Sequence, residues 1–596
     1  MPKIEVNEAV FYQLAGRRWD TREGFEEALT CAKAELDEDV DKNLPVDERT
    51  LKIELTDTNR PDLWGTAGCA RQLRVYHGGD IPRYPFFSVK DAPKQASRTV
   101  LVEQTVRHVR PYLVGFVATG KAISDAALRD MIQTQEKLAW NFGRKRRTIS
   151  MGLYRTAIVA WPIHYRAVDP DSVSFVPLQW DAPLTLREIL KQHPKGKEYA
   201  FIQEHEPLHP LLVDERGGIL SYPPIINSAD IGAVQVGDTD LFVELTGTDM
   251  PSLTLAASIV ACDLADQGFT IEPVAVEYDY DTPFGRKVTT PYYFQEPVFC
   301  SLDRIERFLG EKLSAEACVA ALKHMGCSAE AAQGVERSPD SDDDGTGRPV
   351  LTQGVTLYPP EYRNDFLHAA DVAEDVMIGR GLNTFAPARP RDFTIGRLTP
   401  ITSFSRTVKE ILVGMGYQEM IYNYLGSRKD FVERMRVNGA RIIRIANPMT
   451  ENYEYVRDST LPSLLMSESM SAHAVYPHCI FEVGKVAYRD ERENYGTRTR
   501  QYAGLLTADK DATFNTAASQ LQTLFYYLSK NYSVTETEDS RFIAGRAAVL
   551  VYGGETIGVF GELHPATLEN WGITMPCIAA ELDLDALMGE ERRKEE

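Results

Sequence analysis

The sequence lacks the motifs that mark the commonest enzyme classes. Its 596 residues contain no phosphate-binding loop, no Gly-x-Ser-x-Gly nucleophile elbow and no set of protein-kinase motifs. The eight cysteines include no Cys-x-x-Cys pair, which argues against a zinc ribbon or a disulfide scaffold and favours reduced thiols. The best apolar run, residues 253–262, is far shorter than the roughly 20 residues of a membrane span, and the first residues lack a signal-peptide layout. We therefore expect a cytoplasmic protein that does not cross a membrane.

Basic residues are fewer than acidic ones, since 65 Lys and Arg stand against 86 Asp and Glu and leave a formal net charge of −21. A nucleic-acid partner would therefore have to meet local basic patches, and a nonspecific coat for DNA is disfavoured. The 43% apolar and 10% aromatic residues suffice for several buried cores, and the length suggests about four domains. We expect a multidomain α+β protein.

The N-terminal region, residues 1–85, is expected to form an α/β module. Helical periodicity around residues 24–38 is followed by a strand-like run at 51–55 and by a turn-rich segment that leads into another helix. The next region, residues 86–275, contains short strand-like runs and one well-marked amphipathic helix at 125–142. Both regions therefore combine helices with strands.

A third module is expected at residues 280–387, where two short helices separated by Gly310 have the pattern of a helix-turn-helix. Its basic residues are too few to follow a phosphate backbone, so simple helix packing is favoured over DNA binding. In the last domain, residues 395–592, Gly553 and Gly554 separate two strand-like runs. This pair predicts a two-residue β-hairpin turn.

Four carboxylates crowd one short segment of the third module. Asp371, Glu374 and Asp375 fall on one helical turn, and Asp365 lies just upstream. Like charges at this spacing repel one another, and their number exceeds what the N-terminus of a helix favours. Two interpretations remain open. The carboxylates either hold a Mg²⁺ ion, which prefers oxygen ligands, or form an acidic surface that meets a basic partner.

Two strand-like runs, residues 221–227 and 241–249, place small polar groups where each run ends. Strand ends commonly line binding pockets. Ordinary turns between strands explain the same pattern equally well, so the spacing alone does not decide between a pocket and a turn.

The densest basic cluster in this acidic chain directly follows the helix at 125–142. It consists of Arg144, Lys145, Arg146 and Arg147. Such a run is either a solvated loop or a contact to the phosphates of an RNA.

Several short motifs, in a fixed order along the chain, carry a resemblance to a known family. They are residues 59–63 (NRPDL), 135–138 (QEKL), 223–227 (PPIIN), 246–249 (TGTD), 444–465, 480–486 and 561–565 (GELHP). With these motifs the chain resembles the β subunit of phenylalanyl-tRNA synthetase, in the shorter form that is typical of archaea and eukaryotes. The resemblance extends over nearly the whole length.

The resemblance implies that residues 395–592 are a copy of a class II synthetase core, an antiparallel sheet domain without catalytic residues. A working class II site needs a glycine-rich strand that carries an arginine to hold ATP, and residues 557–565 offer none. Arg457 is then expected to be structural. The resemblance therefore implies that ATP is used by the α subunit and that this chain catalyses no aminoacylation.

The resemblance also implies that residues 86–275 are an editing domain that hydrolyses mischarged Tyr-tRNA(Phe). A pocket shaped for Phe cannot strongly reject a molecule that only adds a hydroxyl, so a second site is needed. By similarity its pocket is formed by Leu212, Ser221, Glu244 and Thr246. Glu244 is the expected acceptor for the phenol of tyrosine, and no nucleophile–base pair is evident, so we expect water to attack the ester with help from the ribose hydroxyl.

The family further implies an α₂β₂ tetramer with the phenylalanyl-tRNA synthetase α subunit, with tRNA(Phe) as substrate. Asp365, Asp371, Glu374 and Asp375 match the magnesium ligands of the family, at a site shared with the α subunit. Residues 280–387 are then a winged-helix-like module that carries this acidic helix. The alternative is a stand-alone RNA-binding or scaffold protein without a synthetase partner.

Overall fold

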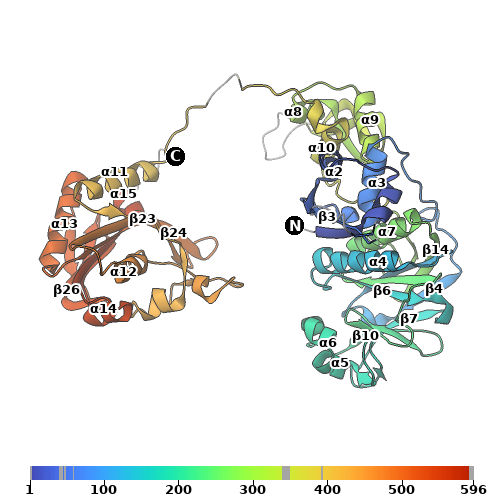
Figure 1. Cartoon of the computed structure of the whole chain (residues 1–596), viewed down its shortest axis with the longest axis horizontal. Helices are drawn as coiled ribbons and strands as arrows, with labels where there is room; N and C mark the ends of the chain where they lie inside the picture. The colour runs from blue at the N-terminus through green and yellow to red at the C-terminus, as the bar shows by residue number, and fades with distance from the viewer. Residues whose placement is uncertain are drawn as a thin grey trace. The chain divides into compact units, whose positions relative to one another are not determined.

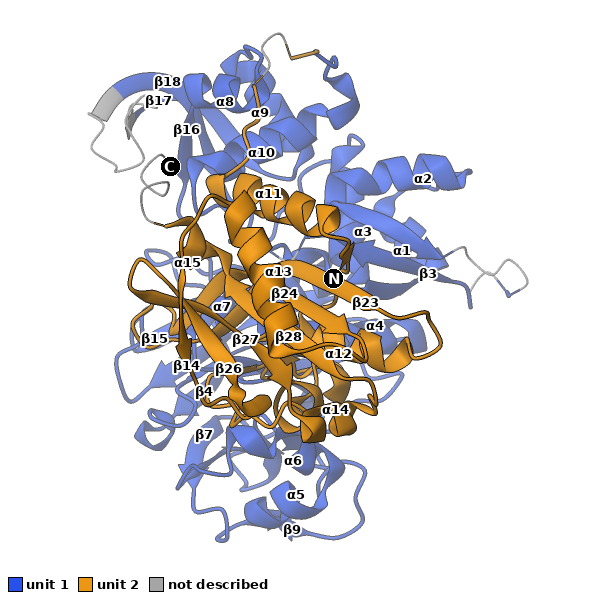
Figure 2. Cartoon of the chain, turned by 90° about the vertical axis from the view of Figure 1, so that its left-hand side faces the viewer, with its two compact units in different colours: residues 1–388 blue, residues 389–596 orange. Residues whose placement is uncertain are grey.

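The computed structural model describes residues 3–38, 44–45, 48–57, 59–337, 349–390 and 394–589. The chain divides into two compact units, Met1–Ala388 and Arg389–Glu596, which are coloured separately in Figure 2. Several sheets with helices packed against them make this a mixed α/β multidomain protein, as expected. All eight cysteines are free, and none of the described helices is long and apolar enough to span a bilayer.

The first unit begins with a small antiparallel sheet covered by helices (Figure 1). In spatial order its strands are β1 (Lys3–Asn7), β3 (Thr50–Leu55) and β2 (Ala34–Glu38), and its helices are α1 (Glu8–Ala15), α2 (Arg22–Leu29) and α3 (Thr66–Tyr76). The strand expected at 51–55 is confirmed as β3. The helix expected around 24–38 ends at Leu29, because Ala34 and Leu36 alternate with exposed acids and pair with β3 as a strand.

A ten-stranded sheet forms the centre of the first unit. In spatial order its strands are β12 (Ile226–Asn227), β11 (Ile219–Tyr222), β10 (His209–Val213), β7 (Ile163–Val168), β4 (Arg98–Val102), β14 (Thr270–Tyr278), β5 (Tyr112–Thr119), β13 (Leu241–Gly247) and β6 (Ile149–Arg155), and β15 (Lys287–Thr290) pairs with β14. The pairs β4–β7 and β4–β14 are parallel, and the other pairs are antiparallel. Strands β5 and β13 are buried along almost their entire length, which explains their continuous apolar sequence.

Two helices cover this sheet. Helix α7 (Met250–Asp266) packs on β5, β13 and β14, and α4 (Asp125–Lys137) continues into a single π turn at Leu138–Phe142. The helix expected at 125–142 is therefore confirmed, although its last turn is wider than an α-helix. Short elements beside β10 complete the region, namely β8 (Ser174–Phe175), β9 (Leu184–Thr185), α5 (Leu186–Gln192) and α6 (Pro194–Tyr199).

The last part of the first unit is a three-stranded sheet with three helices. Its strands, in spatial order, are β16 (Val298–Ser301), β18 (Pro349–Tyr358) and β17 (Ser328–Arg337), and its helices are α8 (Leu302–Leu309), α9 (Ala315–His324) and α10 (Ala369–Arg380). The two expected short helices are confirmed as α8 and α9. Gly310 ends α8 with a φ of 69°, a left-handed conformation that glycine adopts without strain.

The second unit is built on a seven-stranded sheet. In spatial order its strands are β19 (Gln418–Glu419), β23 (His478–Arg489), β24 (Thr497–Ala508), β28 (Cys577–Asp583), β27 (Glu555–Leu563), β26 (Phe542–Tyr552) and β25 (Ser533–Glu536), and all pairs except β19–β23 are antiparallel. A small second sheet joins β20 (Leu425–Gly426), β22 (Tyr455–Val456) and β21 (Ile443–Arg444). The expected hairpin turn at Gly553-Gly554 is confirmed between β26 and β27, with φ values of 59° and 86°.

Two apolar cores surround this second sheet. One joins it to α11 (Pro400–Gly414), α13 (Phe514–Tyr527) and α15 (Leu584–Met588), and the other joins it to α12 (Leu461–Met470) and α14 (Pro565–Trp571). Strand β28 contributes to both cores, with Ile578 and Ala580 in the first and Cys577 and Ala579 in the second. Its alternating side chains therefore face two packed layers.

A buried arginine links three parts of the first unit. Arg71 of α3 is 1% exposed and donates to Asp266 at 2.8 Å and to Asp263 at 3.2 Å, both on α7. Its guanidinium also lies 4.0 Å from the ring centre of Tyr362, which belongs to the segment between β18 and α10. Burial raises the pKa of Asp263 to about 8, and the charge of Arg71 opposes this rise.

Replacing Arg71 by Met should destabilise the first unit by about 3–5 kcal/mol, because two buried carboxylates lose their cation. Thermal unfolding of the full chain measures the loss. The matched control is Arg129→Met, which removes an exposed ion pair with Asp125 and should cost less than about 1 kcal/mol. Equal shifts for the two variants would contradict the role of Arg71.

Candidate functional site

A cavity of about 360 Å³ lies in the first unit and is lined by residues of α4, β6, β13 and the segment 221–227. We call it the Glu244 cavity. Its wall is largely apolar on the side of α4, where Leu128 and Ile132 contribute, and on the side of Ile225. Polar side chains from Ser150, Tyr154, Ser221 and Glu244 also line it, together with charged ones from Glu136, Arg146 and Lys195. A cavity that combines apolar walls with placed polar groups can hold a small molecule.

Glu244 lies in the middle of strand β13 and is only 2% exposed. Its partners on the two neighbouring strands are Gly115 of β5 and Gly152 of β6. Burial raises the pKa of Glu244 to about 7, although Tyr154, Arg110 and Thr246 favour its ionised form. Its Oε1 atom has no hydrogen-bond partner among the described residues. Glu244 is therefore a buried carboxylate in the cavity lining, and one of its oxygens has no hydrogen-bond partner within the described residues although protein atoms cover it.

Tyr154 connects two of the expected pocket residues. Its hydroxyl lies 2.9 Å from Oε2 of Glu244 and 2.8 Å from Oγ of Ser221. A phenol has one proton, so the Tyr154 hydroxyl donates to only one of these two oxygens. When it donates to Glu244, it can accept a hydrogen bond from the Ser221 hydroxyl. Gly152 makes room for this contact, because a Cβ there would lie 2.2 Å from the Tyr154 hydroxyl and 2.5 Å from Glu244 Oε2.

A second buried arginine supports this strand arrangement. Arg110 is 1% exposed and donates to the carbonyl and the hydroxyl of Thr246, at 2.6 Å and 3.0 Å, and to Ser150 at 3.1 Å. It also donates to the carbonyls of Arg146 at 3.2 Å and Arg147 at 2.9 Å. Arg110 thus joins strand β13, which carries Glu244, to the backbone of the basic run.

The four expected pocket residues fall into two groups. Ser221 and Glu244 line the cavity and meet through Tyr154. Thr246 lies two residues beyond Glu244 on β13 and forms hydrogen bonds with Arg110 and Ser150. Leu212 belongs to β10, where it pairs with Ser221 of β11 in the sheet. Leu212 and Thr246 are fully buried and do not line the cavity as it stands.

Sequence reasoning missed Tyr154, Gly152 and Arg110. A glycine inside a strand often marks a close approach, so Gly152 carried a usable signal. No spacing rule pointed to Tyr154 or to Arg110, because each meets its partners from a strand or loop that is distant in the sequence. Tyr154 and Glu244 are 90 residues apart, and Arg110 and Thr246 are 136 apart.

Comparison with known proteins finds the same family along the chain. The family described as "Phenylalanyl tRNA synthetase beta chain CLM domain" matches residues 388–584, and the "tRNA synthetase B5 domain" matches residues 298–382. A phenylalanine–tRNA ligase β subunit from Treponema pallidum is 45% identical over 99% of this chain and 100% of its own length. A second one, from Borrelia recurrentis, is 42% identical with the same coverage. The chain belongs to the phenylalanyl-tRNA synthetase β-subunit family.

A solved structure of this family resembles a large part of the chain. It is an N-terminal fragment of the phenylalanyl-tRNA synthetase β subunit from Pyrococcus horikoshii, with 32% identity and a TM-score of 0.54. The match covers 64% of this chain and all of the fragment. The resemblance drawn from the sequence motifs is therefore confirmed.

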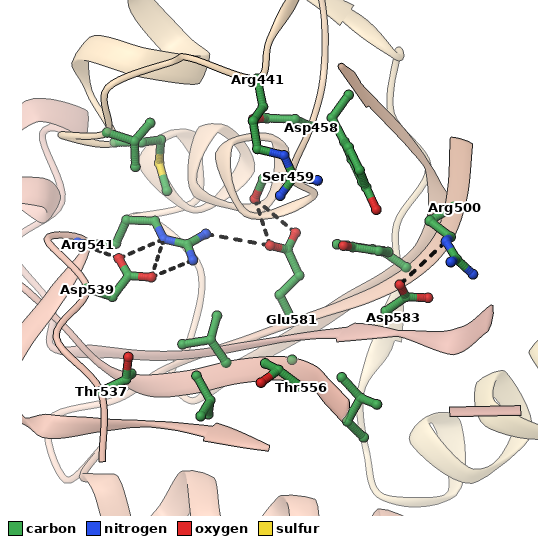
Figure 3. Close-up of a pocket in the computed structure, with 18 of the residues that line it drawn as sticks. Arg441, Asp458, Ser459, Arg500, Thr537, Asp539, Arg541, Thr556, Glu581 and Asp583 are labelled. Atoms are coloured by element: carbon green, nitrogen blue, oxygen red, sulfur yellow. Dashed lines mark hydrogen bonds and ion pairs between the residues drawn. The ribbon is translucent and has the colours of Figure 1, made fainter. Parts of the chain in front are cut away.

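In the region that matches the CLM domain of this β-subunit family, a cleft of about 560 Å³ lies against the seven-stranded sheet. Figure 3 shows that its central charges bind one another. Arg541 pairs with Asp539 at 2.6 Å and lies 3.5 Å from Glu581, and Glu581 accepts hydrogen bonds from Ser459 at 2.9 and 3.1 Å. These groups are therefore occupied by protein partners.

Arg457 has no access to this cleft. Its side chain is fully buried and binds both oxygens of Glu482, at 2.6 and 2.9 Å, and the carbonyl of Lys485 at 3.0 Å. A buried, bidentate arginine–carboxylate pair fixes the strands that carry it. The geometry agrees with the expectation that Arg457 is structural.

The four carboxylates that match the magnesium ligands of the family do not converge on one point. Arg363, 1% exposed, binds Asp365 at 2.6 and 2.9 Å and Asp375 at 2.6 Å. Glu374 pairs with Lys33 at 2.6 Å, and the fourth, Asp371, accepts from the backbone at the start of α10. Burial alone would raise the pKa of Asp365, but Arg363 lowers it to about 2.

These residues as placed do not fit a Mg²⁺ ion. Across the described ranges, no three His, Cys, Asp or Glu side chains are grouped so that they could hold a metal. The guanidinium of Arg363 already supplies the positive charge that relieves the repulsion between Asp365 and Asp375. Both carboxylates are also largely buried, so neither forms an acidic surface for a basic partner.

The basic run divides in two. The guanidinium of Arg146 turns to the Glu244 cavity, where it donates to the carbonyls of Pro224 and Ile225 at 3.1 and 3.2 Å. Arg144, Lys145 and Arg147 are exposed and line a separate cleft of about 1470 Å³. One residue of the run therefore supports the cavity wall, and three face solvent.

Chelation of divalent cations with EDTA should leave the unfolding temperature of the full chain unchanged, because Arg363 occupies the acidic cluster. Arg363→Met should lower the free energy of unfolding by about 3–5 kcal/mol, since two buried carboxylates lose their partner. The matched control is Arg380→Met, which removes an ion pair with the half-exposed Glu311 and should cost less than about 1 kcal/mol. A large shift with EDTA would contradict this assignment.

Proposed function

We propose that this chain is the β subunit of an α₂β₂ phenylalanine–tRNA ligase and that its region 86–275 hydrolyses Tyr-tRNA(Phe). The α subunit would attach Phe to tRNA(Phe) with ATP in the cytoplasm. Membership of the β-subunit family supports the assembly, and it disfavours a stand-alone RNA-binding or scaffold protein. The observation that supports the editing function is the buried Glu244 carboxylate in the cavity lining, because its Oε1 has no hydrogen-bond partner within the described residues.

Glu244 supplies the discrimination between tyrosine and phenylalanine. A tyrosine phenol donates to Oε1 of Glu244, the atom that has no partner, while Tyr154 keeps Oε2. Phenylalanine would fill the same space and leave Oε1 unpaired, at a cost of roughly 1–3 kcal/mol. The apolar side chains of Leu128 and Ile132 accept the ring but do not distinguish the two amino acids.

The cavity favours hydrolysis by water rather than by a side-chain nucleophile. Ser221 is 2% exposed and its hydroxyl is bound by Tyr154, and the cavity lining contains no histidine that could activate it. Water attacks the ester carbonyl, the bond to the ribose oxygen breaks, and tyrosine and a free ribose hydroxyl are released. The neighbouring ribose hydroxyl assists the proton transfer. The residues of this chain bind and orient the aminoacyl group.

The second unit serves assembly in this proposal. Three charged groups at the centre of its cleft, Arg541, Asp539 and Glu581, bind one another, and residues 557–565 contain no arginine for ATP. Residues 1–85, 86–275, 280–387 and 395–592 are assigned as the N-terminal α/β module, the editing domain, the winged-helix-like module and the class II-like domain. Magnesium takes no part in any step assigned to this chain.

Glu244→Ala should lower kcat/KM for deacylation of Tyr-tRNA(Phe) by roughly 5- to 150-fold, because the phenol loses its acceptor. Deacylation of Phe-tRNA(Phe) should stay at its low parental rate. The assay uses the full chain with its α subunit. Glu215→Ala removes an exposed acid of the same region and serves as the control. Unchanged Tyr-tRNA(Phe) clearance in Glu244→Ala would remove Glu244 from the site.

The ratio of Tyr-tRNA(Phe) to Phe-tRNA(Phe) deacylation should rise as the pH increases from about 6 to about 8. The pKa of Glu244 is raised to about 7, so the strongly accepting carboxylate predominates only above that pH. The rate of spontaneous hydrolysis is measured for both esters without enzyme at each pH and is subtracted before the ratio is taken. In Glu244→Gln the ratio should be low and independent of pH, and a ratio that still rises would assign the titration to another group.

The chain should co-purify with a phenylalanyl-tRNA synthetase α subunit when the two are co-expressed, and the complex should charge tRNA(Phe). The chain alone should show no ATP–pyrophosphate exchange with Phe, because residues 557–565, where a class II site carries its arginine for ATP, contain none. Exchange by the chain alone, or failure to associate with the α subunit, would contradict the proposed assembly.

A further inference from the structure

We propose that the cleft in the second unit binds an apolar α-amino acid, a small molecule that carries an ammonium group, a carboxylate and an apolar side chain. The cleft has a volume of about 560 Å³ and belongs entirely to residues 389–596. We call it the Arg441 cleft. The inference goes beyond the proposed function, because none of the residues of this cleft takes part in the binding or hydrolysis of the aminoacyl ester.

The floor of the Arg441 cleft is one face of the seven-stranded sheet. Arg500 and Tyr502 alternate along β24 and therefore point to the same face, and Glu581 and Asp583 do so on the neighbouring strand β28. Tyr502 and Asp583 are paired in register. Nearer the start of β28, the same face packs in the apolar core of α12 and α14. That core therefore gives way to a charged hollow at the other end of the strand.

The balance of charges disfavours a polyanion in the Arg441 cleft. Its lining contains four arginines and six Asp or Glu residues, which leave a formal charge of −2. A triphosphate would therefore be repelled, although a single arginine can still hold one carboxylate. Charges of both signs in one hollow favour a ligand that itself carries both signs.

Two arginines of the cleft have donors to spare. Arg441 is exposed, and its guanidinium lies 3.7 Å from the ring centre of Tyr488. Among the described residues, no ion pair joins Arg441 to a carboxylate. Nε of Arg500 is buried without a hydrogen-bond partner in that part of the chain, 3.8 Å from Asp583. A guanidinium stacked on an aromatic ring keeps its edge free, and this edge is what binds a carboxylate.

Asp458 supplies the opposite charge beside Arg441. Figure 3 shows the two side chains together on one side of the cleft. Burial and the carboxylate of Glu581 raise the pKa of Asp458, although the charges of Arg541 and Arg441 oppose the rise. Within the described ranges, Asp458 forms no ion pair. An ammonium group placed between Asp458 and Glu581 would relieve the repulsion of the two carboxylates.

Apolar side chains complete the cleft. They are Phe431, Met435, Val437, Pro462, Val549 and Val559. A cavity of this size, with apolar walls and a few placed charges, has the usual form of a small-molecule site. The carboxylate of an amino acid would lie at Arg441, its ammonium group at Asp458, and its side chain against the apolar wall.

Calorimetry of the full chain with three related compounds tests the inference. L-Leucine has both charges, its methyl ester lacks the carboxylate, and N-acetyl-leucine lacks the ammonium group. Leucine should bind more tightly than either derivative by about tenfold or more, because each lost charge removes a charge-assisted hydrogen bond. ATP is the reference polyanion and should not bind. No leucine binding at millimolar concentration, equal affinities of the three compounds, or binding of ATP in their place would overturn the proposal.

Two substitutions assign each charge of the ligand to its residue. In Arg441→Met, leucine and its methyl ester should bind alike, while N-acetyl-leucine still binds more weakly. In Asp458→Asn, leucine and N-acetyl-leucine should bind alike, while the methyl ester still binds more weakly. A variant that retains the preference assigned to its residue would overturn the proposal.

The matched control is Lys510→Met combined with Asp511→Asn, which removes an exposed ion pair of the second unit outside the cleft. This control should keep both preferences of the parent. Arg441→Lys retains a cation but not the fork of a guanidinium, so it should keep part of the preference for the free carboxylate. Thermal unfolding of each variant shows that the second unit is folded, and loss of both preferences in the control would count against the cleft.

Editing is measured in the same variants to keep the two proposals apart. Leucine should bind to Glu244→Ala as it does to the parent, because Glu244 lies in the first unit. Arg441→Met, in complex with the α subunit, should clear Tyr-tRNA(Phe) at the parental rate. Leucine binding that is lost in Glu244→Ala but kept in Arg441→Met would overturn the Arg441 cleft while the proposed function stands. Charge-dependent leucine binding without any clearance by the parent would contradict the proposed function instead.

Discussion

The hydrogen bond from Tyr154 satisfies only one of the two oxygens of the Glu244 carboxylate, which lies in the buried strand β13. A buried carboxylate oxygen without a hydrogen-bond partner is costly, and ionisable groups with perturbed pKa values cluster at functional sites. The neighbouring strands make the arrangement possible, since glycines at 115 and 152 flank Glu244 and Gly152 leaves space for the phenol of Tyr154. The proposed selection of tyrosine depends on this one unsatisfied atom.

Local sequence patterns predicted the elements of the fold where local energetics decide the structure. The hairpin at Gly553-Gly554 and the helices around Gly310 formed as expected, because glycines with positive φ fix these turns. The helix expected around 24–38 was wrong beyond Leu29, because pairing with β3 makes a strand of residues 34–38. Strand pairing over distance is not visible in a short window of sequence.

The candidate site was predicted less completely than the fold. Family resemblance indicated Ser221 and Glu244, which line one cavity, but Tyr154, which joins them, approaches from a strand 90 residues away from Glu244. The carboxylates around Asp375 suggested a metal because their charges repel along the helix. The sequence did not reveal that Arg363 would be fully buried between two of them, since that contact requires the packing of α10 against the preceding segment.

The affinity of the full chain for two adenosine analogues tests the central claim most directly. One carries tyrosine and the other phenylalanine through a 3′ amide, which resists hydrolysis and separates binding from chemistry. Calorimetry should find the tyrosyl analogue bound roughly 5- to 150-fold more tightly, because only its phenol can pair with the free oxygen of Glu244. Equal affinities, or tighter binding of the phenylalanyl analogue, would contradict the account.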